Sequence, residues 1–358
     1  MKTTKTKSIT TLLCALALML VMYNCKKKDE PFPTEPPKEL VDKINDIEIT
    51  PITATPPAPV ATTPAGVTAS PEAAALSNAL NDMATTGVIP ASITATGAAV
   101  SAAIPAADLA ILSAISPETL ASVKAGGALS PAAQAAVDKA LTNPAIAALL
   151  PKFTYPTVGG QVVNGRVAAV GGTTTTATTD VLESGEAIEA VLVDDACIAS
   201  AENAFQTVKT KLDAARDAEN LKVQTTYSTT IAPYAAEVTA CQAAVNYTAQ
   251  RTAIDTQVAQ ALANLETARA ILTAAGLYDV FVSLINVQAA GAYIGINNLE
   301  AADKAACTAL STAKTASAAA ARDTDLAKVQ AEYSTKLAAA TAVKAELIAS
   351  CHNQGGGN

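Results

Sequence analysis

The stretch AARDAENLKVQTTYST at residues 214–229 recurs as AARDTDLAKVQAEYST at residues 320–335. Ten of the sixteen positions match at an offset of 106 residues, and the matching residues include Arg, Asp, Lys, Gln and Tyr as well as Ala. Composition alone does not produce such agreement between uncommon residues, so the two stretches indicate an internal duplication. Both copies lack proline and are rich in helix formers, which predicts that the duplicated unit is helical.

Apolar residues recur through both copies at steps of three and four. One stripe comprises Leu326, Val329, Tyr333, Leu337, Ala340, Val343, Leu347 and Cys351, and the other comprises Val223, Tyr227, Ile231, Tyr234, Val238 and Cys241. The average step is close to the 3.6 residues of a helical turn, which is typical of a bundle seam. We therefore predict an Ala-rich antiparallel helical bundle over residues 183–354, with its cysteines facing the core, and a flexible tail at 355–358.

The composition supports a mainly α fold and excludes several functions. Half of the 358 residues are apolar, but only 3% are aromatic and none is Trp. Closely packed helices with small side chains fit this composition, whereas platforms that stack bases or sugars need aromatic rings. The formal charge of -8 leaves no basic footprint for nucleic acid. The length predicts two or three domains.

Four cysteines lie in the predicted bundle, 44 residues apart within each copy: Cys197, Cys241, Cys307 and Cys351. In an oxidising envelope, an even set of cysteines predicts two disulfides. Buried free thiols are the alternative. A zinc site with four cysteine ligands usually has them in close pairs, and no such pair occurs here, so no metal site is predicted.

Two pairings of these cysteines are compatible with an up-and-down bundle. Local pairing joins Cys197 to Cys241 and Cys307 to Cys351. Nested pairing joins Cys197 to Cys351 and Cys241 to Cys307. Equal spacing allows all four cysteines to lie at one level of the bundle, so geometry permits both schemes. We favour local pairing, because its partners are closer in sequence and its loops close at a lower entropic cost.

Residues 277–296, between the two copies, form the most apolar stretch of the mature chain. The stretch contains Phe281 and Leu284, together with Gly291 and Gly295, a pair of small residues that favours close packing. A membrane-spanning helix at this position would bury an aspartate, an asparagine and a glutamine in hydrocarbon, each at a cost on the order of 1 kcal/mol or more. We therefore predict a central buried helix.

We predict that residues 70–155 form a small domain of four or five short helices. A residue that caps helices stands directly before a proline at Ser70, Ser116, Ser130 and Asn143. The capping side chain accepts a hydrogen bond from a free N–H at the helix start, and proline fits the first helical position. Helices this short are marginal alone, so a partly ordered extension of the preceding segment is the alternative.

Residues 156–182 are rich in Gly and Thr and contain one β signal. Two extended runs, 161–163 and 166–170, flank Asn164 and Gly165, a dipeptide typical of type I′ turns. We predict a β-hairpin at this domain junction. The glycines lack the spacing and the Lys-Ser/Thr pair of a phosphate-binding loop, so no cofactor is predicted.

The first 25 residues have the order of an export signal. Lys2, Lys5 and Lys7 precede a largely apolar run from residue 9 to residue 23, and Cys25 follows it. At about 15 residues the run is short for a bilayer span, which needs roughly 20. An uncleaved anchor and an ordinary signal peptide cut further on are the alternatives.

With Cys25 followed by the sequence KKKDE, the N-terminus resembles that of a Bacteroidota-type bacterial lipoprotein. The resemblance implies that residues 1–24 are removed as a signal peptide and that Cys25 is acylated, which anchors the protein to the outer membrane. Lys28, Asp29 and Glu30 resemble a surface-export signal, which implies display outside the cell. Without that export the protein would face the periplasm.

Residues 25–69 are predicted to form a stalk. They contain nine prolines between Pro31 and Pro64, interspersed with Thr and Ala. Proline stiffens such a segment into extended conformations of about 3.1 Å per residue, and we expect it to pack no core. A disordered spacer is the alternative.

Removal of residues 1–24 takes away three lysines, so the formal charge of the chain changes from -8 to -11. Because an acidic protein repels anionic lipid, the acyl chains must do the anchoring.

No catalytic residue is predicted. His352 is the single histidine, and adjacent residues on a helix point about 100° apart, so it is not expected to pair with the Cys351 thiol. We expect a non-enzymatic envelope lipoprotein that presents its helical bundle as a structural or interaction module to a protein or envelope partner. The alternative is a lipoprotein that binds a small apolar ligand within the bundle, since small side chains can leave a cavity.

Overall fold

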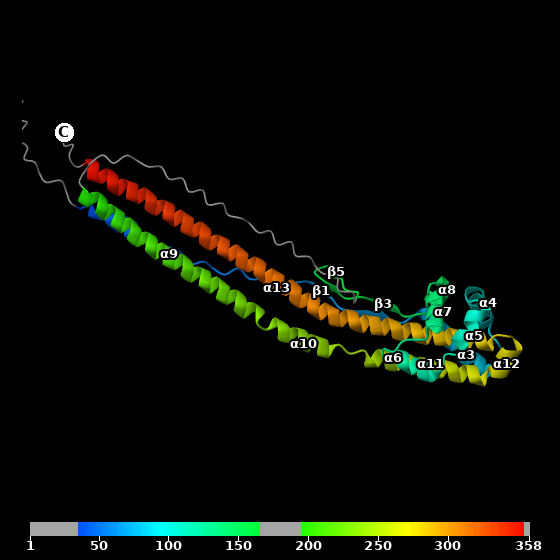
Figure 1. Ribbon diagram of the computed structural model, residues 1–358. Coiled ribbons are helices and arrows are strands. Elements are labelled where there is room, and N and C mark those ends of the chain that lie inside the picture. The colour runs from blue at the N-terminus through cyan, green and yellow to red at the C-terminus, as the bar shows by residue number, and fades with distance from the viewer. Residues whose placement is uncertain (1–34, 165–194, 354–358) are drawn as a thin grey trace, which may run out of the picture. The chain divides into compact units, whose positions relative to one another are not determined.

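The computed structural model of the chain describes residues 35–164 and 195–353 (Figure 1). Helices make up most of these residues, so the mainly α fold is confirmed. The described chain forms two compact units. The first unit contains residues 35–54, 195–224 and 324–353, and the second contains residues 55–164 and 225–323.

This division differs from the predicted domains. The predicted bundle at 183–354 is shared by both units, because helices α9 (Asp195–Ile231) and α13 (Tyr278–Asn353) contribute residues to each of them. The predicted small helical domain at 70–155 is part of the second unit. Its core is continuous with that of the neighbouring long helices, so the sequence boundary near residue 155 does not separate two cores.

In the first unit, the parts of α9 and α13 that belong to it run antiparallel. Their seam is built from residues at steps of three and four, as predicted for the second copy of the repeat. Val329, Ala340 and Leu347 are fully buried. The seam residues that pack together are Ala201, Val208, Leu212, Tyr333, Ala340, Val343 and Leu347.

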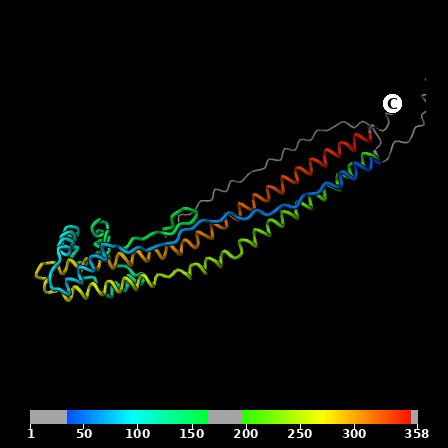
Figure 2. Tube along the Cα trace, turned by 180° about the vertical axis from the view of Figure 1, so that it is seen from behind, coloured from blue at the N-terminus to red at the C-terminus, as the bar shows by residue number. Residues whose placement is uncertain are grey.

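The predicted stalk also packs on this seam, which corrects the expectation that residues 25–69 pack no core. Helix α2 (Lys38–Asn45) lies along the pair (Figure 2), and Ile44 and Ile49 are buried in the same cluster. Lys43 Nζ lies 2.7 Å from Glu346 Oε2, and the Thr50 N–H donates to Glu332 Oε1 at 3.2 Å. The prolines lie on either side of the short amphipathic stretch KELVDKIN, whose apolar spacing forms a helix with Ile44 on its buried face.

In the second unit, three consecutive helices form one arm of a helical hairpin. They are α10 (Tyr234–Ala244), α11 (Thr248–Thr267) and α12 (Arg269–Ala274). The chain then reverses at Gly276, whose φ of +68° suits glycine because it has no Cβ. Helix α13 returns antiparallel to the arm, because its contacts run in reverse order: Cys241 is bonded to Cys307, and Arg251 lies 2.7 Å from Glu300.

Six shorter helices pack against this hairpin: α3 (Pro71–Thr86), α4 (Ala91–Ala103), α5 (Ala106–Ser113), α6 (Pro117–Lys124), α7 (Pro131–Leu141) and α8 (Pro144–Ala147). All four predicted start signals are confirmed. The side chains of Ser70, Ser116, Ser130 and Asn143 each accept a hydrogen bond from a backbone N–H in the first turn of α3, α6, α7 and α8. These helices therefore begin where local capping chemistry places them.

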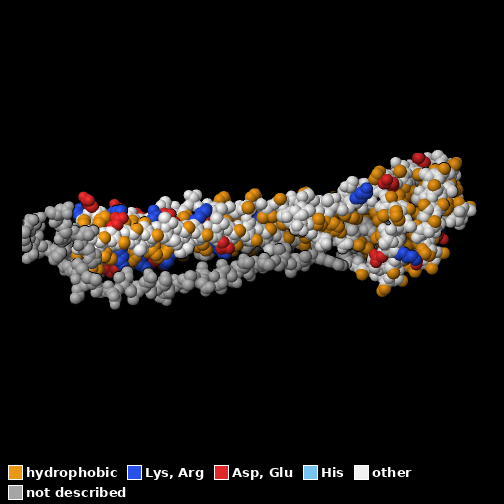
Figure 3. All heavy atoms as spheres, turned by 90° about the horizontal axis from the view of Figure 1, so that it is seen from above, with side chains coloured by type: hydrophobic (Ala, Val, Ile, Leu, Met, Phe, Trp, Pro, Cys, Tyr) orange, Lys and Arg blue, Asp and Glu red, His pale blue; other side chains and the backbone are white. Residues whose placement is uncertain are grey.

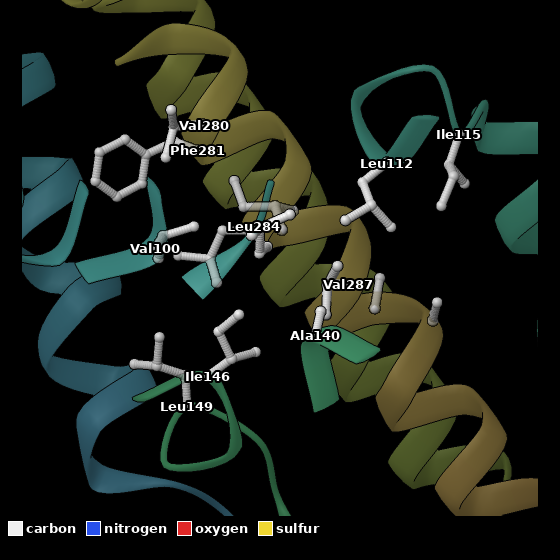
Figure 4. Packing of buried hydrophobic residues seen from close by; sticks show 14 of the residues in the cluster. Val100, Leu112, Ile115, Ala140, Ile146, Leu149, Val280, Phe281, Leu284 and Val287 are labelled. Atoms are coloured by element: carbon white, nitrogen blue, oxygen red, sulfur yellow. The ribbon is translucent and has the colours of Figure 1, made fainter. Parts of the chain in front are cut away.

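The core of the second unit surrounds the first turns of α13. Figure 4 shows Leu284 of α13 facing Val100 of α4, and Val287 of α13 beside Ala140 of α7. Phe281, Leu284 and Val287 are fully buried. The prediction of a central buried helix over residues 277–296 is therefore confirmed. The helix that buries this stretch is the N-terminal part of α13, which begins at Tyr278.

Gly291 and Gly295 of α13 lie where other side chains approach its backbone closely. A Cβ at Gly291 would lie 2.9 Å from the side chain of Leu141, and a Cβ at Gly295 would collide with the ring of Phe153.

By length and composition, α13 and the bent pair of α4 with α5 are the candidate membrane spans among the described residues. A buried core helix passes the same test, and 72% of the apolar window of α13 lies inside the protein.

Short strands connect these helices. β1 (Thr62–Thr63) pairs with β4 (Thr157–Val158), β4 pairs with β5 (Gln161–Val162), and β2 (Gly66–Thr68) pairs with β3 (Lys152–Thr154), all antiparallel. The hairpin of β4 and β5 turns at Gly159 and Gly160, which both have positive φ. The sequence predicts the turn at Asn164 and Gly165 instead. The second extended run of that predicted hairpin, residues 166–170, lies outside the described residues. Residues 161–162 are extended as predicted, but with the preceding strand as their partner.

Candidate functional site: the disulfide-linked helical pair

Each unit contains one disulfide between antiparallel helices. In the first unit Cys197 of α9 is bonded to Cys351 of α13, with a Cα–Cα distance of 5.9 Å. In the second unit Cys241 of α10 is bonded to Cys307 of α13, with a Cα–Cα distance of 5.8 Å. All four cysteines that the sequence singled out are therefore paired with one another.

The pairing is the nested one, which corrects our preference for local pairing. Cys307 and Cys351 both lie on α13, and residues 44 positions apart on one continuous helix cannot meet. The local pairing would form if each copy folded back on itself as a hairpin. Instead, each copy lies along the other, so each cysteine meets a partner from the opposite copy.

The two disulfides differ in exposure. Cys197, Cys307 and Cys351 are buried at 2%, 6% and 6% exposure, as predicted for core-facing cysteines, whereas Cys241 is exposed. Cys241 belongs to α10, a helix in which no residue is buried. The predicted stripe from Val223 to Cys241 is thus only partly covered between Tyr227 and Cys241. The disulfide holds α10 to α13 where little apolar surface is buried.

The repeated motif supplies a second set of contacts between its own copies. The guanidinium of Arg216 lies over the ring of Tyr333, with its Cζ 4.6 Å from the ring centroid. The guanidinium of Arg322 lies over the ring of Tyr227 at 4.7 Å. Arg216 and Arg322 are equivalent positions of the repeat, and so are Tyr227 and Tyr333. Each copy therefore gives its arginine to the tyrosine of the other copy, a cation–π contact in both directions.

A polar cluster that the sequence did not predict lies in the second unit. Asp255 of α11 accepts hydrogen bonds from Lys124 Nζ and Tyr293 Oη, each at 2.5 Å. Burial acts to raise the pKa of Asp255, but these two donors outweigh it and lower the pKa. Burial, together with the bond to Asp255, raises the pKa of Tyr293. The three residues are far apart in sequence, so no spacing pattern could have revealed the cluster.

We expect Asp255→Asn to lower the free energy of unfolding by about 1 kcal/mol at pH 7, because two donors lose an ionised acceptor in a partly exposed site. The folded-state pKa of Asp255 lies below its usual 3.8. The ionised carboxylate therefore stabilises the fold above about pH 3.8, and this contribution disappears as the pH falls through the lowered pKa. Urea unfolding at pH 7 and at pH 3 measures both values.

The control is Asp82→Asn, which changes an exposed aspartate of α3 and should alter stability by less than about 0.5 kcal/mol at either pH. An equal loss for Asp255→Asn at both pH values would show that the charge of Asp255 contributes nothing.

The described residues of the second unit form three grooves, of which one, of about 780 Å³, is lined by residues 110–133 alone. A second, of about 490 Å³, borders the Cys241–Cys307 disulfide and contains Tyr247, whose hydroxyl donates to Asp303 Oδ2 at 2.5 Å. Burial and this hydrogen bond raise the pKa of Tyr247. The third groove, of about 430 Å³, lies between α3, α11 and α13. Sequence reasoning allowed for a cavity in the bundle but could not place one.

The remaining predicted residues offer no reactive arrangement in the part of the chain that is described. Cys25 and the residues from Lys28 to Glu30 lie outside the described ranges. The sulfur of Cys351 is bonded to Cys197, so it is not a thiol that His352 could activate. Within residues 35–164 and 195–353, no group of three or more His, Cys, Asp or Glu side chains is placed to hold a metal ion. On the face shown in Figure 3, basic and acidic side chains are interspersed.

Comparison of the chain with protein families, with curated proteins and with solved structures finds no match.

Proposed function

We propose that this protein is a non-enzymatic envelope lipoprotein that presents its helical pair as a structural or interaction module. Acyl chains on Cys25 would hold it in the outer membrane, with the folded part displayed at the cell surface. The membrane is thus one partner, and a protein or another envelope component is the second.

The observation that carries this proposal is the pair of disulfides between antiparallel helices. Disulfides persist in oxidising compartments such as the periplasm and the cell surface. They also constrain a seam in which Ala201, Ala340 and other small side chains bury little apolar area for each residue. A chain reinforced in this way suits an extracytoplasmic scaffold.

The charge of the chain supports anchoring by lipid. After removal of residues 1–24 the formal charge is -11, which repels anionic lipid headgroups. A single acyl chain gives only marginal binding, and each buried methylene contributes about 0.8 kcal/mol, so stable attachment requires more than one chain on Cys25.

Intact-mass analysis of the native protein tests the anchor. We expect a mature chain that starts at Cys25 and carries the mass of its acyl chains, and reduction should add four hydrogens for two disulfides. In Cys25→Ala the acyl mass should be lost. Cys14→Ala, which changes the other cysteine of the N-terminal region, should leave the mature mass unchanged. A purified protein that retains Met1 and carries no lipid would overturn the proposal.

Protease treatment of whole cells tests display. If the folded part lies outside the cell, trypsin added to intact cells should degrade the protein while a periplasmic marker survives. Protection until the outer membrane is permeabilised would place the protein on the periplasmic side and would leave the anchor intact.

A further inference from the structure

The groove between α3, α11 and α13 has the size of a small-molecule site. Its volume is about 430 Å³, within the range of roughly 300–1,000 Å³ that is usual for ligand pockets. Three helices and the strand connections supply its walls, so one part of the chain alone does not form it. The apolar walls include Leu76, Leu80, Ile254, Val258, Ile285 and Ile296.

The lining of this groove selects against two classes of ligand. It contains no Asp, Glu, Lys or Arg side chain, so an ionic ligand would lose its hydration without gaining a counter-charge. It contains no Phe, Tyr or Trp side chain either, so it has no surface for aromatic stacking. Most of the other lining residues are aliphatic, and the uncharged polar ones are Ser70, Ser77, Asn78, Gln250, Gln257, Gln260 and Gln288. A lining of this kind suits an uncharged ligand that has an aliphatic chain and a polar group.

One polar atom in the groove lacks a partner. Gln250 Oε1, on the first turn of α11, is buried and accepts no hydrogen bond from the described residues. Buried acceptors are almost always satisfied in folded proteins, because leaving one unpaired is costly. Gln250 lies between this groove and the one that borders the Cys241–Cys307 disulfide, and it lines both of them. On the side of the groove proposed here it is followed by Ile254 and Val258, one and two helical turns further along α11. Gln250 therefore marks the position at which a ligand needs a hydrogen-bonding group.

A hydroxyl group fits this position best. Gln250 Oε1 is an acceptor, and a hydroxyl group supplies the O–H donor that it lacks. A carboxylate could only accept, and it would bring a charge into a groove that has no basic side chain.

We propose that this groove binds an uncharged aliphatic amphiphile that carries a hydroxyl group. The hydroxyl hydrogen-bonds to the Gln250 amide, and the aliphatic chain lies against Ile254, Val258 and Ile285. This site develops the alternative hypothesis of an apolar ligand and does not depend on the acylation of Cys25, so the two proposals can fail separately.

Photolabelling in membranes that contain the full chain tests the site. The probe is a decanol analogue with a diazirine on its chain, and mass spectrometry locates the labelled residues. We expect labels to concentrate on the groove walls, and we expect excess 1-decanol to reduce them at least tenfold. Decanoate, which has the same chain and a charge, should compete at least tenfold more weakly than 1-decanol.

Two variants separate the shape of the groove from its hydrogen bond. Ala253→Phe places a ring in the groove from an exposed position and should reduce labelling at least tenfold. Its control, Ala263→Phe, changes an exposed alanine of the same helix outside the groove and should leave labelling unchanged. Gln250→Leu should weaken competition by 1-decanol about fivefold, the loss expected for one hydrogen bond, while competition by decane stays the same.

Three results would overturn the proposal: labels spread without preference for the groove, equal competition by decanoate and 1-decanol, or unchanged labelling in Ala253→Phe. Because Gln250→Leu removes an unpaired polar atom, it should fold at least as well as the wild type. It therefore keeps the test decisive if Ala253→Phe does not fold.

Discussion

Replacing Cys197 and Cys351 by alanine lowers the free energy of unfolding by up to about 5 kcal/mol in the chain-entropy model, because this disulfide closes the longer loop of the two. Its partners are separated by 154 residues. Replacing Cys241 and Cys307, which are separated by 66 residues, removes up to about 4 kcal/mol. Urea unfolding followed by the helical circular dichroism signal measures both losses.

Single substitutions test the pairing directly. In Cys197→Ala, alkylation without a reductant should label Cys351, because that residue has lost its partner. In Cys241→Ala it should label Cys307. If Cys197→Ala instead exposed the thiol of Cys241, the local pairing would be present and the antiparallel alignment of the two copies would be wrong.

Phe281→Ala should be the most damaging single core substitution, with a loss of about 3–5 kcal/mol in the free energy of unfolding. The ring of Phe281 is fully buried, and it packs within the cluster that α3–α8 share with α11–α13. The alanine would leave a cavity at the point where α13 meets the short helices. Thermal and urea unfolding measure the effect.

The control for Phe281→Ala is Val88→Ala in the same unit, where the side chain is 65% exposed and the change should stay within about 0.5 kcal/mol. Because the short helices and the hairpin share one core, Phe281→Ala should destabilise both together. Loss of the hairpin while α3–α8 stayed folded would indicate that the region 70–155 has a core of its own.

Local chemistry explains what could be predicted from the sequence. A capping side chain followed by proline fixes a helix start without help from distant residues, and Ser70, Ser116, Ser130 and Asn143 all act as predicted. The buried stripe through Val329 and Leu347 also follows from spacing alone.

Long-range contacts explain what could not be predicted. Nothing near Ile44 in sequence indicates that it packs on α9 and α13, so the segment around it was predicted to be a stalk. The cluster of Lys124, Asp255 and Tyr293 joins residues from three separate helices. The disulfide pairing depends on whether a copy folds on itself or on its twin, and the spacing of the cysteines is the same in both cases.

The exchange of contacts between the copies makes the chain equivalent to a homodimer fused into one polypeptide. The cysteines recur at an offset of 110 residues, since 307 - 197 and 351 - 241 both equal 110, four more than the offset of the motif. By their order in each copy, Cys197 corresponds to Cys307 and Cys241 to Cys351, so the two disulfides join the first cysteine of each copy to the second cysteine of the other. Residue i touching j′ while j touches i′ is the signature of isologous association, in which one surface serves both subunits. Fusion of the two copies makes that association independent of protein concentration.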